Sequence, residues 1–380
     1  MQILIFLLLL LPGVTYAQKH DNIWILGYGG GTQSGSNDSN GLSIINFDLA
    51  FQMQNNQTCN LNLTGTNSGF CDSLGNLLMV CNGEKVYHGG LNLMINGGGL
   101  NATNGYGTAQ PQGALTLPWP EHPNLYVLLV VEVKTFSPQL VTGFKLYYNL
   151  LNINSDDPVD SEVVVKKQLI IQDSMENGQL SACKHANGRD WWILMPESHS
   201  NRYYTFLLDP SGLSLVDTQA VGDVFFAGLG QAVFTPDGSK YLRVNGNDLF
   251  EPNHLYLYDF DRCTGKLSNP LHWEYEPGGL GMGCAISHNS RILYAAMNAV
   301  KLIQYDLWAP DVESSGVVVG EYDGYIHEQH FYTAFSIAQL APNGRIYMST
   351  NGSTPFLHVI DHPGRRGAAC GFRQRGLHLF

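Results

Sequence analysis

The feature that most constrains the fold is a phrase that recurs along the chain: an apolar run, a tight polar turn and a second apolar run. The clearest copies span residues 230–244 and 335–349, where Pro-Asp-Gly and Pro-Asn-Gly separate β-prone segments. Weaker copies span residues 69–80, 181–193 and 283–294. Proline presets φ, Asp or Asn bonds to its own backbone, and glycine accepts a positive φ, so each phrase predicts a β-hairpin.

These turns recur at a nearly regular spacing. The turn residues that anchor the repeats are Gly75, Pro123, Asn187, Asp237, Asn289 and Asn343. Successive anchors lie about 50 residues apart with one longer gap, and no helical periodicity intervenes. A repeat of this length that contains about four short strands is typical of a β-propeller. We therefore predict an all-β propeller of four-stranded antiparallel blades.

The number of blades and the closure of the ring follow from chain length. Roughly 360 residues divided by a repeat of about 50 gives seven blades, with six as the alternative. Because six anchors are visible, we expect one composite blade, in which strands at residues 23–26 and 42–47 pair with C-terminal strands after Asn351. Such pairing of the two ends protects sheet edges. Residues 18–380 are predicted to form one propeller domain.

The first 17 residues predict a secretory signal peptide. Residues 4–11 form an unbroken apolar run, and Val14-Thr-Tyr-Ala17 offers a small-residue cleavage site before Gln18. The run is shorter than the roughly 20 apolar residues of a membrane span, and no later stretch is long enough. We expect a secreted or cell-surface protein with no membrane span.

Composition narrows the classes of partner. The formal net charge is −12, so no basic field is available to neutralise phosphate, which argues against nucleic acid. The 42 glycines and the 11% of aromatic residues suit many turns and aromatic-rich strands rather than a helical bundle.

Seven cysteines follow the predicted signal peptide, so at least one has no partner within the chain. We predict a disulfide between Cys59 and Cys71, which a Gly- and Asn-rich loop separates. Cys183 and Cys284 precede the turn in two repeats and are expected to be small buried core residues. No Cys-x-x-Cys motif is present, which disfavours a zinc or redox site built on cysteine.

Five ordered phrases carry a resemblance to a known family. They span residues 71–78, 185–192, 258–270, 304–307 and 339–347. Together they resemble the secreted β-propeller proteins of Bacteroidota, and the resemblance covers almost the whole chain after residue 17. It implies a propeller fold and export, often by the type IX secretion route, without an assigned reaction. Such proteins often carry a C-terminal sorting domain, whereas this sequence ends at Phe380 soon after Cys370-Gly-Phe.

The densest polar cluster lies at residues 184–190. Propellers usually bind ligands at the central channel or at the loops around one mouth, so we predict binding residues here. The predicted binding residues are His185, Asn187, Arg189 and Trp192. Two alternatives stay open: the Asn-Gly turn satisfies only its own backbone, and the Trp pair at 191–192 packs in the core instead of forming a sugar platform.

Metal-dependent chemistry has two sets of candidates. His327 and His330, beside Glu328, have a spacing that suits metal ligands, but we favour a solvated loop here and assign no metal site. Calcium-dependent propeller lactonases use carboxylate and amide oxygens that converge on the channel. The residues of this type are Glu132, Asn245, Asp248 and Asn298. Gly-x-Ser-x-Gly is absent, which disfavours a serine hydrolase with a nucleophile elbow.

Regular repeats without a recognisable catalytic constellation favour a binding protein. We expect an exported, non-catalytic binding or scaffolding propeller whose partner is a protein or a glycan, with no cofactor. The alternative is a calcium-dependent, lactonase-like hydrolase with its site in the central channel.

Overall fold

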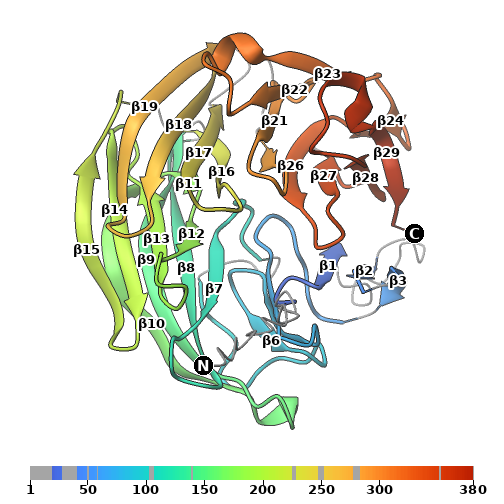
Figure 1. Ribbon diagram of the computed structural model, residues 1–380. Helices are drawn as coiled ribbons and strands as arrows, with labels where there is room; N and C mark the ends of the chain where they lie inside the picture. Colours follow the sequence, from blue (N-terminus) through green and yellow to red (C-terminus); the bar gives the residue numbers. More distant parts are fainter. Residues whose placement is uncertain are drawn as a thin grey trace, which may run out of the picture.

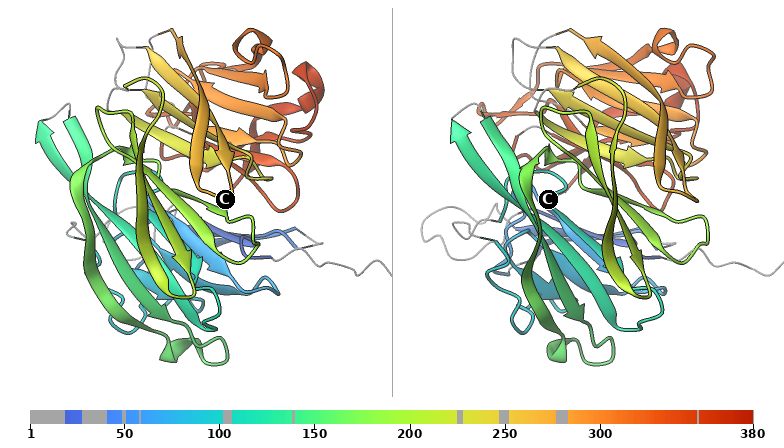
Figure 2. Two further views of the ribbon diagram at one scale, coloured as in Figure 1. Left: turned by 60° about the vertical axis from the view of Figure 1, so that its left-hand side comes forward. Right: turned by 90° about the vertical axis from the view of Figure 1, so that its left-hand side faces the viewer.

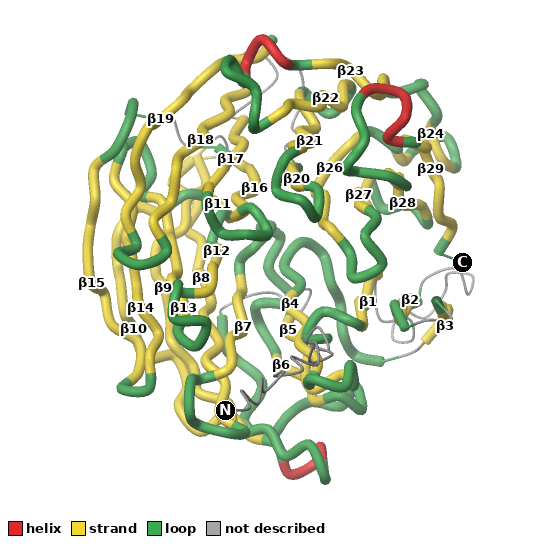
Figure 3. Tube along the Cα trace, in the orientation of Figure 1, coloured by secondary structure: helices red, strands yellow, loops and turns green. Residues whose placement is uncertain are grey.

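The computed structural model describes the chain in ten segments. They are residues 19–27, 41–48, 51–57, 59–101, 107–137, 140–224, 228–246, 252–276, 283–350 and 352–379. These segments form seven antiparallel sheets, or blades, arranged around a common centre (Figure 1). Strands and loops account for nearly all of the described chain, and the helical segments are short (Figure 3). The prediction of a seven-bladed, all-β propeller is confirmed.

The first three blades are built from consecutive strands. Blade 1 contains β1 (Ile23–Gly27), β2 (Leu42–Asn46) and β3 (Gln52–Gln57). Blade 2 contains β4 (Ser68–Cys71), β5 (Leu77–Cys81) and β6 (Val86–His88). Blade 3 contains β7 (Ala114–Pro118), β8 (Leu125–Ser137), β9 (Leu140–Asn152) and β10 (Glu162–Met175). The long β8–β9 hairpin reaches beyond the neighbouring sheets (Figure 2).

The remaining four blades each contain four antiparallel strands in chain order. Blade 4 contains β12 (Ser181–Lys184), β13 (Trp191–Pro196), β14 (Arg202–Asp209) and β15 (Gly212–Ala220). Blade 5 contains β16 (Leu229–Phe234), β17 (Lys240–Gly246), β18 (Asn253–Asp261) and β19 (Lys266–Tyr275), and the short β11 (Asn177–Gly178) pairs parallel to β16. Blade 6 contains β20 (Cys284–Ile286), β21 (Ile292–Met297), β22 (Lys301–Asp306) and β23 (Val317–Glu321). Blade 7 contains β26 (Phe335–Leu340), β27 (Ile346–Thr350), β28 (Phe356–Ile360) and β29 (Phe372–His378).

Small elements complete the described chain. They are the hairpin of β24 (Ile326–His327) with β25 (Phe331–Tyr332) and the 3-10 turns η1 (Pro158–Asp160), η2 (Glu313–Ser315) and η3 (Gly367–Cys370). None of the described helices is long and apolar enough to cross a membrane. The predicted signal peptide lies outside the described residues.

Each predicted turn joins the first and second strands of a blade. In the turn between β16 and β17, Asp237 Oδ1 accepts hydrogen bonds from the Thr235 hydroxyl at 2.6 Å and from the Ser239 amide at 2.9 Å, and Gly238 has a φ of +71°. The side chain of Asp and the positive φ of Gly thus play the roles that the sequence assigned to them.

The core lies between neighbouring blades. Middle strands such as β17 and β21 are buried along almost their whole length because a neighbouring blade covers each of their faces. Leu255 and Trp273 of blade 5, for example, pack with Ile303 and Tyr305 of blade 6. The outermost strand β15 is mostly exposed or partly exposed. Continuous apolar runs therefore mark middle strands, and the predicted core positions Cys183 and Cys284 are indeed buried.

The predicted closure of the ring by pairing of N- and C-terminal strands is wrong. Within the described residues, β1, β2 and β3 form a sheet of their own, and blade 7 obtains its fourth strand from β29. The ring closes by packing instead: Ile45 and Phe47 of blade 1 contact Tyr347 and Leu357 of blade 7. The Ser43 hydroxyl also donates a hydrogen bond of 2.8 Å to a backbone carbonyl beside the end of β29.

The predicted disulfide between Cys59 and Cys71 is not formed, and both are free cysteines. Cys71 is buried at the end of β4, where its amide donates to the His20 carbonyl. Cys59 packs on a separate cluster of buried side chains that includes Leu61 and Tyr87. Burial raises the pKa of the Cys71 thiol to about 11, which makes it a poor nucleophile.

Candidate functional site

A cavity of about 920 Å³ occupies the centre of the ring. Its walls are formed chiefly by the innermost strands of the other blades, with Leu180 just before β12 as the described contribution of blade 4, so segments from far apart in the sequence meet there. The cavity lies where propellers usually bind their ligands, and its size suits a small molecule or a short stretch of polymer.

The described lining of the cavity combines polar and apolar groups and is almost uncharged. Hydroxyl and amide side chains come from Thr64, Asn67, Ser68, Gln112, Thr116, Gln231, Ser336, Gln339, Ser349, Thr350 and Ser353. Apolar side chains, among them Trp24, Val233 and Ile337, form at least as much of the wall. The ionisable side chains of this described lining are the carboxyl of Asp21, which is exposed, the thiol of Cys284 and the phenol of Tyr347. No pair of carboxylates and no histidine therefore meets among the described lining residues.

Two glutamines in the wall join blades that are not neighbours. Gln112, just before β7, exchanges two hydrogen bonds with the backbone of Ala232 in blade 5, at 2.7 and 2.8 Å. Gln231 of blade 5 donates to the Ala338 carbonyl of blade 7 at 2.7 Å. Its side-chain oxygen accepts from the amides of Cys284, at 2.9 Å, and Ala338, at 3.2 Å. These amides hold the inner strands in place and are not available to a ligand.

The structure brings the predicted binding cluster together on the turn between β12 and β13, away from the cavity wall. Asn187 Oδ1 accepts from the amides of Arg189 and Asp190 at 2.9 and 3.0 Å, and His185 Nδ1 accepts from the Asn187 amide at 3.0 Å. Arg189 forms ion pairs at 2.7 Å with Asp190 and with Glu121. These contacts match the alternative of a self-satisfied turn, and the binding role of the cluster stays a prediction.

Trp192 belongs to the core. It is buried, its indole N–H donates to the Arg262 carbonyl at 2.8 Å, and its ring stacks on His185 with centroids 5.3 Å apart. The predicted alternative of core packing thus describes Trp192, and the His185 ring lies over its face.

The predicted metal ligands do not converge. His327 and His330 lie on the β24–β25 hairpin, where Glu328 is 3.8 Å from His327 and the described residues supply no third ligand. Among the lactonase-type residues, Glu132 pairs with Lys145 in blade 3, Asn245 is buried between blades 4 and 5, and Asn298 is buried in the turn after β21. Asp248 lies outside the described residues. None of the three described residues lines the cavity.

A buried polar seam between blades 4 and 5 is a feature that our sequence interpretation missed. Glu176, just before β11, lies 3.6 Å from Arg243 of β17, and both side chains are fully buried. The Asn245 amide donates to the Glu176 carboxylate at 3.3 Å. The guanidinium of Arg243 lies over the ring of Tyr256 at 5.0 Å. The alternation of Tyr241, Arg243 and Asn245 with Leu242 and Val244 along β17 was the available signal.

Burial dominates the electrostatics of this seam. It raises the pKa of Glu176 to about 7, and the nearby positive charge of Arg243 opposes the shift only in part. Because the carboxyl is closed off from solvent, it acts on folding stability rather than on a substrate. One further group of ligand-type side chains, His254, His272 and Glu274, lies outside the cavity on the two outer strands of blade 5.

Comparison with solved structures agrees with the fold. The chain is similar to a periplasmic gluconolactonase from Pseudomonas aeruginosa, with a TM-score of 0.54 and 12% identity over 93% of this chain and 95% of that chain. It is also similar to the Dos1 propeller, with a TM-score of 0.46 and 14% identity over 89% and 78% of the two chains. A third similar structure is the Cps50 β-propeller domain of Myceliophteria thermophila, with a TM-score of 0.44 and 12% identity over 87% and 96%.

At 12% identity the likeness to the gluconolactonase shows the propeller fold alone, because the same fold hosts many unrelated functions. No protein-family model matches the chain, and no curated protein sequence is significantly similar to it. The resemblance to secreted Bacteroidota propellers stays a prediction.

Proposed function

We propose that this chain is an exported β-propeller that binds an uncharged, hydroxyl-rich ligand, such as a stretch of glycan, in its central cavity without transforming it. The observation that carries the proposal is the described cavity lining, which offers hydroxyls, the amides of Asn67 and Gln339 and apolar groups, with a single exposed carboxylate. Sugars are recognised by hydrogen bonds from such groups and by contact with aromatic rings, and Trp24 supplies a ring at the wall.

The same lining disfavours hydrolysis at this site. A glycosidase needs two carboxyl groups across the scissile bond, and a calcium-dependent hydrolase needs several oxygen ligands around one ion. The described wall offers Asp21 alone. The lactonase alternative therefore has a similar fold in its favour but no matching set of side chains in the described cavity, and binding without chemistry is the function that the geometry supports best.

A glycan array probed with the purified protein tests the proposal, with Gln339→Trp as the decisive variant. Gln339 lies on the innermost strand of blade 7, lines the cavity and is exposed, so a bulky ring at this position fills space without disturbing the core. We expect the variant to keep its fold and to lose at least about 10-fold in affinity for any glycan that wild type binds.

Arg189→Ala is the matched control, since it alters the turn that the sequence singled out. Loss of binding in Arg189→Ala with none in Gln339→Trp would move the site to that turn and overturn the cavity assignment. Turnover of gluconolactone that depends on added calcium would overturn the non-catalytic function and favour the alternative.

A further inference from the structure

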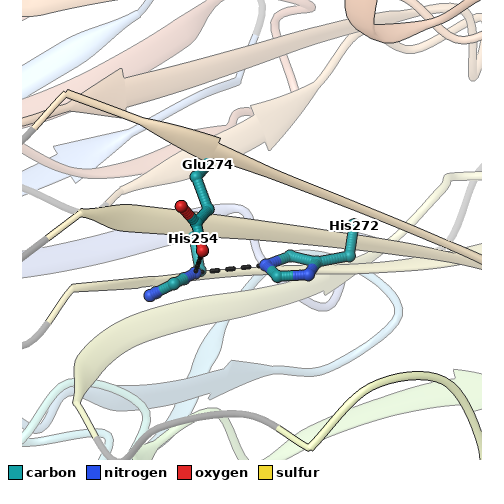
Figure 4. A group of neighbouring side chains, drawn as sticks. All are labelled: His254, His272 and Glu274. Atoms are coloured by element: carbon teal, nitrogen blue, oxygen red, sulfur yellow. Dashed lines mark hydrogen bonds and ion pairs between the residues drawn. The ribbon is translucent and has the colours of Figure 1, made fainter.

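A compact group of imidazole and carboxylate side chains lies on the outer part of blade 5 (Figure 4). The antiparallel register places His254 of β18 directly opposite Glu274 of β19, and Tyr256 opposite His272. Because alternate residues of a strand share one face, all three ligand-type side chains project from the same side of the sheet. That side faces blade 4, since Tyr256 packs there against Tyr203 in one buried cluster.

The ligand atoms are already close to the spacing that a metal requires. His254 Nδ1 lies 3.1 Å from His272 Nε2 and 3.7 Å from Glu274 Oε1, and the three atoms all lie within 4.8 Å of one another. Tetrahedral zinc with bonds of about 2.0–2.1 Å separates its ligand atoms by roughly 3.3 Å. No two of the three atoms are more than 4.8 Å apart, so side-chain movements of at most about 1.5 Å suffice to place all three around one ion.

The surroundings hold His272 in the orientation and tautomer that a ligand needs. Asp223, in the connection between blades 4 and 5, accepts a hydrogen bond from His272 Nδ1 at 3.2 Å. This bond leaves the lone pair of Nε2 directed at the group, as in the carboxylate–histidine–metal arrangement of known sites. The ring of Tyr256 stacks on His272 at 4.4 Å with an interplanar angle of 9°, which fixes the plane of the imidazole.

His254 and Glu274 supply the buried and the exposed sides of the group. His254 is 5% exposed, so its imidazole forms the buried side of the group. The side chain of Glu274 is 57% exposed, which leaves the outer side of the group open to water. Two imidazoles, one carboxylate and an open position form a donor set that suits zinc.

We propose that His254, His272 and Glu274 form a binding site for one divalent transition-metal ion, zinc above all, with Asp223 as the residue that positions His272. The site is independent of the central cavity, so a result on zinc binding neither supports nor contradicts the proposed function. A bound ion would join β18 to β19 and, through Asp223, to the segment that follows blade 4.

The test uses the full chain, freed of metal with EDTA and titrated with zinc chloride by calorimetry. A Cys263→Ser background removes the exposed thiol as a competing ligand. We expect one zinc ion per chain, weaker binding of calcium and magnesium, and a higher melting temperature in the presence of zinc. Cobalt(II) in place of zinc should give the visible absorption of a tetrahedral site.

Variants locate the site. Glu274→Gln and His272→Gln replace two ligands on the outer strand, and we expect each to weaken zinc binding by at least about 10-fold. Asp223→Asn removes the acceptor that positions His272, and we expect it to weaken zinc binding by about 10-fold. His330→Gln is the matched control, because His330 lies on the β24–β25 hairpin, and it should leave binding unchanged. Absence of saturable zinc binding, or binding that persists in both Glu274→Gln and His272→Gln, would overturn the proposal. So would loss of binding in His330→Gln.

Discussion

At the scale of single residues, the ionisation of Glu176 is coupled to folding. Burial raises its pKa from 4.5 to about 7, so the folded state holds a proton that the unfolded state releases above pH 4.5. The stabilising contribution of this proton is fully present below pH 4.5 and is lost as the pH rises to about 7. The full effect of such a shift is about 3 kcal/mol.

Glu176→Gln isolates this contribution, because glutamine has nearly the same shape and does not titrate. Relative to the variant, we expect the unfolding free energy of wild type to fall by about 3 kcal/mol between pH 4.5 and 7.5. Urea unfolding of both proteins across this range is the measurement. Parallel curves for the two proteins would show that Glu176 is ionised throughout and paired with Arg243.

Residue-level prediction from sequence worked where the interaction is local. Asp237 hydrogen-bonds to residues within a few positions of itself, and Gly238 sets the local backbone conformation, so the sequence of the turn predicts both roles. The Glu176–Arg243 contact and the His254–His272–Glu274 group depend on how blades pack and how strands align. No local pattern fixes those distances, although charged and polar residues at alternate positions of an apolar strand signal that a partner exists.

At the scale of elements, the repeated turns allow a matched comparison. Gly238 and Gly344 occupy the same position in two blades, with φ of +71° and +78°. A Cβ on Gly344 would have no atom within 4 Å, so Gly344→Ala meets only the backbone cost of a left-handed residue, about 1 kcal/mol. A Cβ on Gly238 would lie 2.6 Å from Cys183 Sγ and from Arg262 Cδ.

We therefore expect Gly238→Ala to cost about 2–3 kcal/mol, two to three times the cost of Gly344→Ala, because overpacking adds to the backbone strain. Urea unfolding of both variants beside wild type measures the two costs. Equal losses would mean that Cys183 and the flexible side chain of Arg262 move aside without penalty.

At the scale of the whole molecule, the sequence predicted the ring but not how it closes. Each repeat in the sequence corresponds to one blade, so the spacing of the repeats predicts the number of blades. Closure depends on which segment supplies the last strand of blade 7. That strand, β29, reads Phe-Arg-Gln-Arg-Gly-Leu-His, with three polar residues in succession and a glycine, and it carries little strand signal. It fills the edge that the N-terminal strands were predicted to occupy.

Without shared strands between the two ends, contacts across the channel gain importance for the ring as a whole. Gln231 is 5% exposed and bonds to backbone groups of both Cys284 in blade 6 and Ala338 in blade 7. Gln231→Leu keeps the volume but leaves two amides and one carbonyl without this partner, which costs about 2–4 kcal/mol. Gln339→Leu, on the exposed wall of the same channel, is the control and should change stability by less than about 0.5 kcal/mol. Denaturant unfolding measures both, and a loss in Gln231→Leu no larger than in the control would show that packing between blades 1 and 7 holds the ring without help from the channel.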